Sequence, residues 1–302
     1  MIGQFLSIFF DVTLPVFALV LVGYFVGPRL GLEARTLSRA SYFIFIPAFV
    51  FHVISEANVE IAVASRMVIY ISVVIIACAL LGFVTAKLLG RSREIVAAYV
   101  LVAVFANVGN FGLSLIEFKL GRTALVPGTI YFLAVVVIAF VICVIAASWV
   151  RDGGFGAAVS VVRTPALIAI LPAVFFSATH IEIPLFVSRA TNLLGNAMIP
   201  TMLVTLGVQL ASVGKPQINS DVIIANAVRL LGGPILAALL VIPFGLTGLE
   251  RSAGILQASM PAGVTISIIA IEYDLVPNFI TTTILASTLA SLVTLTFVLL
   301  LV

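Results

Sequence analysis

Charged residues are scarce in this chain: Asp, Glu, Lys and Arg together make up 9% of its 302 residues. A typical soluble domain carries about 25% of such residues. Hydrophobic residues make up 63% of the chain, and its mean hydropathy is +1.32. Because no soluble core hides so much apolar surface, we infer that the surrounding solvent is lipid. The composition predicts an integral, multi-pass membrane protein.

Cysteine and histidine are also rare. Cys78 and Cys143 lie in apolar runs, which favours buried thiols over a disulfide or a metal site. With two histidines and no H-E-x-x-H, G-x-S-x-G or phosphate-binding loop motif, the chain has little that favours an enzyme. The basic residues stand singly and the net charge is only +3, so nucleic acid is not an expected partner. We therefore expect no cofactor and no metal ion.

Long apolar runs dominate the sequence. A membrane-spanning helix needs about 20 such residues, and charges, prolines and glycines divide the chain into ten runs near that length. The predicted spans are 12–29, 37–55, 66–88, 95–118, 125–149, 164–180, 186–211, 221–244, 251–273 and 277–301. A β-barrel would instead require short alternating segments. The fold class predicted is all-α, with ten transmembrane helices.

Lys and Arg are distributed unevenly between the loops. The odd-numbered loops carry Arg29, Arg35, Arg39, Lys87, Arg91, Arg93, Arg151, Arg163 and Lys215, and the even-numbered loops carry Arg66, Lys119, Arg122, Arg189 and Arg251. Cytoplasmic loops usually hold the excess of basic residues. The bias of nine to five predicts that the odd-numbered loops are cytoplasmic and that both termini lie on the outer side.

Two pairs of segments resemble each other across the chain. Segments 37–54 and 187–210 both begin near Ser-Arg-Ala and reach a proline within the span. Segments 94–121 and 250–275 both begin with Glu, and near its end each carries a Glu followed by an aromatic residue. Since five spans is an odd number, a second repeat of five enters the membrane from the opposite side.

We therefore predict two inverted five-helix repeats, 1–150 and 165–302, joined by a short cytoplasmic linker, 151–164.

The fourth and ninth spans are interrupted where each should cross the middle of the membrane. The stretch "VFANVGNFGLSL" (104–115) holds two Asn and two Gly, and "SMPAGVTIS" (259–267) holds Pro and Gly. Lipid leaves freed backbone groups unsatisfied, so such breaks occur only where protein or a water-filled cavity covers them. In inverted-repeat transporters two broken helices meet at the substrate site. We predict this crossover at 106–112 and 260–264.

The residues of the two breaks suit an anion. Neither break contains Asp or Glu, and the N-terminal ends of half-helices carry partial positive charge. Glycine permits unwinding, Asn amides donate hydrogen bonds, and proline removes one backbone donor. The candidate substrate-binding residues are Asn107, Gly109, Asn110, Gly112, Pro261, Ala262, Gly263 and Thr265. In the alternative interpretation, Asn and Gly only allow close helix packing.

Other polar residues lie within or at the ends of spans. Pro47, Asn196, Gln209 and Ser267 are candidates to line the cavity, with hydrogen bonding between or within helices as the alternative. The candidates for charge compensation or proton coupling are Arg229, His52 and Glu117. Arg229 either neutralises a carboxylate or extends to the interface near Asp221. His52 and Glu117 have structural alternatives, as a hydrogen-bonding residue and a solvated helix cap.

Several segments resemble the auxin efflux carrier family, which includes the plant PIN-FORMED carriers and short microbial members. "FIPAFVFHVIS" (45–55) is similar to the family's second span, and "NVGNFG" (107–112) to the fourth-span break of its microbial members. "AVRLLGGP" (227–234), "LQASMPAGVTIS" (256–267) and "EYDLVP" (272–277) are similar to the eighth span, the ninth span and the junction before the tenth.

The resemblance implies a fold related to the bile-acid/sodium symporter superfamily. It implies a scaffold of spans 1, 2, 6 and 7, a transport domain of spans 3–5 and 8–10, elevator-type alternating access, a homodimer, and a place in the bacterial inner (plasma) membrane. The substrate it implies is a small organic anion: malonate, malate or an auxin-like acid. The short linker departs from the long loop of many plant members and leaves the substrate open. The energy source is left open between a proton gradient, the membrane potential and sodium symport. An anion channel and a ligand sensor are the alternative functions.

Overall fold

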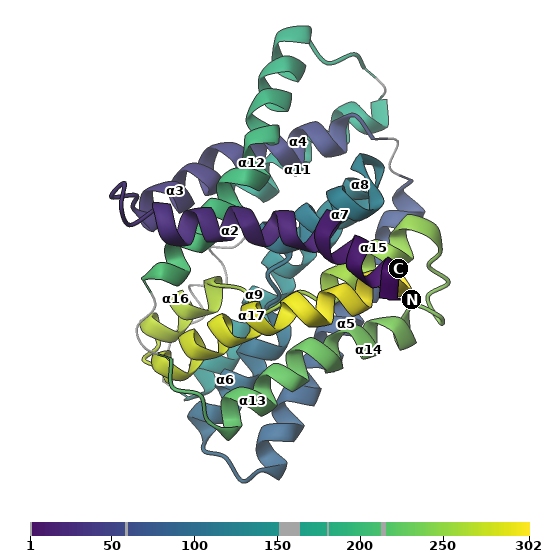
Figure 1. The fold of residues 1–302 in the computed structure, drawn as a ribbon. Helices are drawn as coiled ribbons and strands as arrows, with labels where there is room; N and C mark the ends of the chain where they lie inside the picture. Colours follow the sequence, from purple (N-terminus) through teal and green to yellow (C-terminus); the bar gives the residue numbers. More distant parts are fainter. Residues whose placement is uncertain (1, 58–59, 151–163, 180, 213–215) are drawn as a thin grey trace.

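The computed structural model describes residues 2–57, 60–150, 164–179, 181–212 and 216–302, and these are almost entirely helical (Figure 1). In the first half lie α1 (Ile2–Ile8), η1 (Phe9–Thr13), α2 (Leu14–Val26), α3 (Ala34–Ala40), η2 (Ser41–Phe45), α4 (Ile46–Ser55), α5 (Ile61–Leu88), α6 (Arg93–Val104), η3 (Val108–Gly112), α7 (Leu113–Leu120), η4 (Arg122–Ala124), α8 (Leu125–Ala134), η5 (Val135–Ala139) and α9 (Phe140–Val150). In the second half lie α11 (Pro165–Thr179), α12 (Leu185–Ala211), α13 (Ser220–Ala227), η7 (Val228–Gly232), α14 (Gly233–Leu240), α15 (Gly248–Ala258), α16 (Thr265–Glu272) and α17 (Pro277–Leu301).

Part of the predicted organisation lies outside the described residues. This applies to the linker except Thr164, and to Arg151, Arg163 and Lys215, which contribute to the predicted orientation.

Seven helical stretches in the described part of the chain are long and apolar enough to cross a membrane. They are Gly3–Val26, Ala34–Ser55, Ile61–Leu88, Arg122–Val150, Leu185–Ala211, Ser220–Leu240 and Pro277–Leu301. They coincide with the predicted spans 1, 2, 3, 5, 7, 8 and 10. The predicted sixth span is the shorter apolar helix Pro165–Thr179, and the predicted fourth and ninth spans are each divided into two helices.

Two predicted boundaries are wrong by several residues. The first helical stretch begins near the N-terminus and not at residue 12, and α5 begins at Ile61 and not at residue 66. Asp11 and Arg66 mark the predicted ends, yet both are exposed within continuous helix. Charged side chains at the end of a span reach the interface without interrupting the backbone, which explains the difference.

The helices pack in two groups. In the first group α2 packs against α12, and α4 packs against α11 and α12 (upper part of Figure 1). Their approach depends on small residues: a Cβ atom on Gly23 would lie 2.1 Å from the Val204 oxygen, and one on Gly207 would lie 2.0 Å from the Val20 oxygen. The second group, with α5, α6, α13, α14 and α17, fills the lower part of Figure 1.

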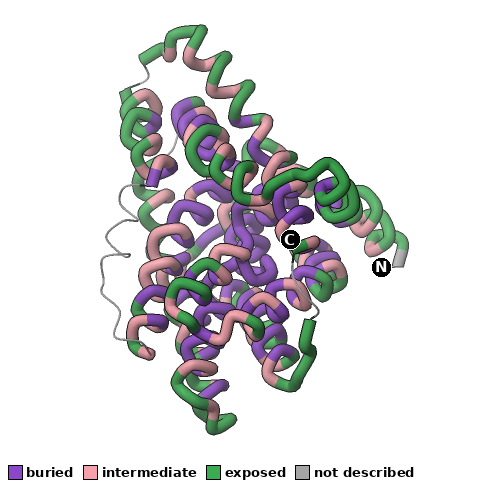
Figure 2. Tube along the Cα trace, turned by 90° about the vertical axis from the view of Figure 1, so that its left-hand side faces the viewer, coloured by how far each residue is buried: buried purple, intermediate pink, exposed green. Residues whose placement is uncertain are grey.

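Burial is greatest where the two groups meet (Figure 2). Helix α6 is buried on all sides, since every residue from Val96 to Val104 is buried. By contrast, α5, α14 and α17 expose large apolar side chains such as Leu80, Ile235 and Leu289, as expected of faces that contact lipid. A helix that is buried all round therefore leads the chain into the centre of the molecule.

Candidate functional site

Two interrupted helices cross at the centre of the molecule. Helix α6 ends at Val104 and α15 ends at Ala258, and the chain is not α-helical again until Leu113 and Thr265. Between these points Ala106 and Ala262 form an antiparallel β-bridge.

Two backbone hydrogen bonds hold this crossing. The Asn107 N–H donates to the Pro261 oxygen, and the Gly263 N–H donates to the Phe105 oxygen, each over 2.8 Å. The Ala262 N–H lies 3.2 Å from the Ser287 hydroxyl of α17. Each break therefore satisfies backbone groups that the other leaves free, as the absence of water in a bilayer core requires.

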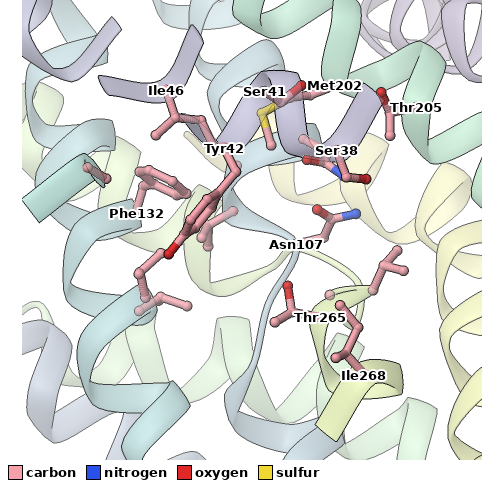
Figure 3. Close-up of a pocket in the computed structure, with 18 of the residues that line it drawn as sticks. Ser38, Ser41, Tyr42, Ile46, Asn107, Phe132, Met202, Thr205, Thr265 and Ile268 are labelled. Carbon is pink, nitrogen blue, oxygen red and sulfur yellow. The ribbon is translucent and has the colours of Figure 1, made fainter. Parts of the chain in front are cut away.

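A cavity of about 600 Å³ lies beside the crossing (Figure 3). Its walls come from the crossing, from the segment α3–η2–α4, from α8 to α9, and from α12. Apolar side chains form much of it, among them Ile46, Phe132 and Met202. It reaches the exposed Arg35 and Arg39, in the region that the charge bias predicts to be cytoplasmic.

The Asn107 side chain projects from the crossing among these cavity residues (Figure 3). Asn107 is only 5% exposed, and its Nδ2 atom has no hydrogen-bond partner within the described part of the chain. Three other buried polar atoms without a partner there also belong to lining residues: Ser41 Oγ, Thr164 Oγ1 and Gln209 Oε1. Since buried polar groups are normally paired, the cavity holds hydrogen-bonding capacity that the described residues leave unused.

The charged residues described in the lining of this cavity are basic. Arg35 and Arg39 are among its lining residues, and none of the described residues that line it is acidic. Amide and hydroxyl donors combined with guanidinium groups suit a carboxylate.

The predicted site residues divide into two sets. The first set lines the cavity beside the crossing and consists of Asn107, Gly109, Asn110, Gly263, Thr265 and Gln209. The second set does not line it and consists of Gly112, Pro261, Ala262, Pro47, Ser267 and Asn196.

The second set has structural contacts instead. A Cβ on Gly112 would lie 1.8 Å from Gln257 Oε1, and the Pro261 oxygen accepts a hydrogen bond of the crossing. Ala262 is fully buried. The Ser267 hydroxyl donates to the Val264 oxygen of its own turn over 2.7 Å.

The glycines of the breaks do not adopt the left-handed conformation. Gly109, Gly112 and Gly263 are absent from the described glycines with positive φ. Lack of space gives a further reason for glycine at two of these positions. A Cβ would lie 3.0 Å from Phe132 Cε2 at Gly109 and 2.9 Å from Phe105 Cδ1 at Gly263.

A second cavity of about 1010 Å³ contains His52, Glu117 and Asn196, near the opposite ends of α4 and α12. His52 Nδ1 lies 3.2 Å from Glu56 Oε1, and Glu117 Oε1 lies 3.4 Å from Arg122 Nε. The Asn196 amide donates to Asn192 over 2.6 Å. These predicted residues therefore gather away from Asn107.

Arg229 occupies neither of its two expected places. It is 2% exposed and does not line either cavity. Its guanidinium donates to the backbone oxygens of Ala103 and Ala258. Asp221, its expected neighbour at the interface, is bound by Arg91 over 2.8 Å.

Sequence reasoning missed the start of the second span. Five residues of this region line the first cavity: Arg35, Ser38, Arg39, Ser41 and Tyr42. A signal was present, because Ser38 and Arg39 belong to the Ser-Arg-Ala stretch that recurs in the seventh span. Phe132, Val135 and Phe140 carried no signal, since apolar residues are expected throughout a span.

Comparison with known proteins adds independent information. The family described as membrane transport protein matches residues 155–299. An uncharacterized transporter of Methanocaldococcus jannaschii is 27% identical over 299 residues, covering 93% of this chain and 95% of that protein. An uncharacterized transporter of Methanothermobacter thermautotrophicus is 27% identical over 94% of this chain and 95% of its own length.

Plant proteins match a shorter stretch. A probable auxin efflux carrier component of Oryza sativa subsp. japonica is 33% identical over 116 residues. The match covers 37% of this chain and only 21% of the rice protein. The likeness to the plant carriers is therefore partial, whereas the likeness to the archaeal transporters extends over nearly the whole chain.

Proposed function

Because the chain belongs to the membrane transport protein family that includes the auxin efflux carriers, we propose that it is a secondary transporter of a small organic anion. One observation carries this proposal: the buried side-chain nitrogen of Asn107 has no hydrogen-bond partner in the described chain and lies at the crossing of two broken helices, in a cavity with no acidic residue among its described lining. A carboxylate group supplies the acceptor that this amide lacks.

The mechanism proposed is alternating access by an elevator movement. The helices of the proposed scaffold, α2, α4, α11 and α12, pack together, and the crossing lies outside this group. The two cavities lie toward opposite ends of α4 and α12, which suits a site that is reached from one side at a time. Ten transmembrane helices in two inverted repeats, and a homodimer, complete this proposal.

The substrate class proposed is a mono- or dicarboxylate such as malonate or malate, or an auxin-like acid. The guanidinium groups and the amide suit carboxylate groups, and the apolar wall suits a hydrocarbon or aromatic body. The energy source proposed is a proton gradient or the membrane potential, which supplies about 2.3 kcal/mol per elementary charge at 100 mV. Sodium symport is the alternative.

Uptake into proteoliposomes tests the function. Labelled malonate is presented with and without a proton gradient, and labelled indole-3-acetate is the second substrate. We expect saturable uptake and acceleration by unlabelled substrate on the opposite side, which a channel does not give. Absence of uptake for both acids in every gradient, sodium included, would contradict the proposal.

The site is tested in the same assay. Asn110→Ala removes an amide from the cavity lining, and we expect it to lower uptake by about tenfold or more. Asn278→Ala is the matched control, since Asn278 is exposed and lines neither cavity. Equal uptake by the two variants would exclude Asn110 from the binding site.

A further inference from the structure

Among the described residues, one buried cation contacts both broken helices. Arg229 donates from Nη1 to the Ala103 oxygen and from Nη2 to the Ala258 oxygen. Ala103 belongs to the last turn of α6, and Ala258 is the last residue of α15. Among the described residues, no carboxylate forms an ion pair with this guanidinium. Its partners are therefore the carbonyl ends of the two half-helices.

These two ends carry charge of the wrong sign for an anion site. The C-terminal end of a helix is equivalent to about −0.5 elementary charge. Two such ends converge on Arg229, so their sum is close to one negative charge, which a guanidinium balances. Without that balance, the negative ends of α6 and α15 would offset the positive N-terminal ends of the half-helices that follow the breaks.

The sequence around Arg229 allows its guanidinium to approach the end of α15. Arg229 lies in the π-turn η7, and Pro234 follows one turn later. A Cβ atom on Gly233 would lie 2.6 Å from the Ala258 oxygen and 2.9 Å from Arg229 Nη2. Glycine is therefore required for α14, the guanidinium and α15 to approach so closely. These contacts explain why Arg and Gly occur in the stretch "AVRLLGGP" (227–234), although none of its residues lines the cavity.

We propose that Arg229 is a positioning residue that determines the charge of the transported substrate. It neutralises the carbonyl ends of α6 and α15 and holds them together, so that the electrostatic potential at the crossing is positive and the site accepts anions. This proposal rests on the proposed function, because it concerns the same site, but it also makes a claim about the crossing that does not depend on transport.

Three variants test the proposal, and two more serve as controls. Arg229→Met removes the charge, and Arg229→Lys keeps it. Gly233→Ala displaces the guanidinium without altering charge. Gly3→Ala is the glycine control, because a Cβ there meets nothing within 4 Å. Arg189→Met is the arginine control, since Arg189 is exposed and lines neither cavity.

The first measurement is the KM and maximal rate of anion uptake. We expect Arg229→Met to raise KM by about tenfold or more, because a nearby unit charge in a partly desolvated site acts on that scale. Arg229→Lys should recover most of this loss, and Gly233→Ala should raise KM in the same direction. Two results would overturn the proposed role of the Arg229 charge: an unchanged KM in Arg229→Met, or a KM in Arg229→Lys as high as that in Arg229→Met.

The second measurement is hydrogen exchange of the Asn107 and Gly263 amides, which form the two bonds of the crossing. We expect faster exchange in Arg229→Met and in Gly233→Ala, with no change in either control. If the wild-type protein transports none of the tested anions, the proposed function fails, yet this measurement still decides whether Arg229 holds the crossing. If Arg229→Met does not fold, Gly233→Ala decides, and exchange equal to that of Gly3→Ala overturns the proposal.

Discussion

The Asn107 amide is a buried donor without an acceptor in the described chain. Leaving such a group unpaired costs about 1–3 kcal/mol. Asn107 also holds the crossing through its backbone, where its N–H donates to Pro261. The backbone contact would tolerate many side chains, so the side-chain amide needs another reason, which the proposed substrate would provide.

Replacing Asn107 by Asp tests this reason. The substitution keeps the size of the side chain but exchanges a donor for a carboxylate, which would repel an anion within the cavity. We expect uptake to fall by about a hundredfold, as when one charge pair becomes repulsive in a desolvated site. Asn278→Asp, on an exposed residue, should leave uptake of the labelled acid unchanged. Equal uptake by both variants would show that Asn107 does not contact the substrate.

At the scale of residues, the sequence predicted which polar residues are unusual, but it did not predict which groups they contact. Asn107, Asn110 and Thr265 were predictable because polar groups are costly inside a span. The contact of Arg229 with two carbonyls was not, because it joins residues that are 126 and 29 positions apart in sequence. Such contacts depend on packing between helices, which composition does not encode.

At the scale of elements, the interruptions of the fourth and ninth spans were predictable from Asn, Gly and Pro. Their pairing through the β-bridge was not, since the bridge joins Ala106 and Ala262. Two alanines give no sequence signal, and the two hydrogen bonds between their neighbours are made by backbone atoms alone. The ends of the regular helices were predicted within a few residues, except where Asp11 and Arg66 lie inside a helix.

The contact between α2 and α12 gives a prediction at this scale. Gly207→Ala places a Cβ 2.0 Å from the Val20 oxygen and so forces α2 away from α12. We expect a loss of stability of about 1–3 kcal/mol, the usual cost of overpacking. Thermal unfolding in detergent measures it, with Gly3→Ala as the control. A Gly207→Ala midpoint equal to that of the control would mean that the two helices are not held this closely.

At the scale of the whole molecule, the elevator proposal requires the two helix groups to slide past each other. The rings of Phe5 and Phe297 lie 5.2 Å apart, between the first helical stretch and α17. The rings of Phe51 and Phe176 lie 6.0 Å apart, both within the proposed scaffold. One pair spans the proposed sliding boundary and the other does not.

A cross-link across this boundary should stop transport. Cysteines replace Phe5 and Phe297 in one variant, and Phe51 and Phe176 in the control, with Cys78 and Cys143 changed to Ala in both. We expect a short bis-maleimide to abolish uptake in the first variant and to leave most of it in the second. Full uptake by the cross-linked first variant would argue against movement between the two groups.

The crossing also has a consequence for biosynthesis. Phe105 and Asn107 emerge from the ribosome more than 150 residues before their partners, Pro261 and Gly263. Until the ninth span is inserted, the backbone of the fourth has no partner for these groups, and lipid offers none. A chain that stops before this point is expected to keep the fourth segment at the interface or bound to a chaperone, and to be cleared by membrane proteases. The proposed substrate site would thus form only near the end of translation.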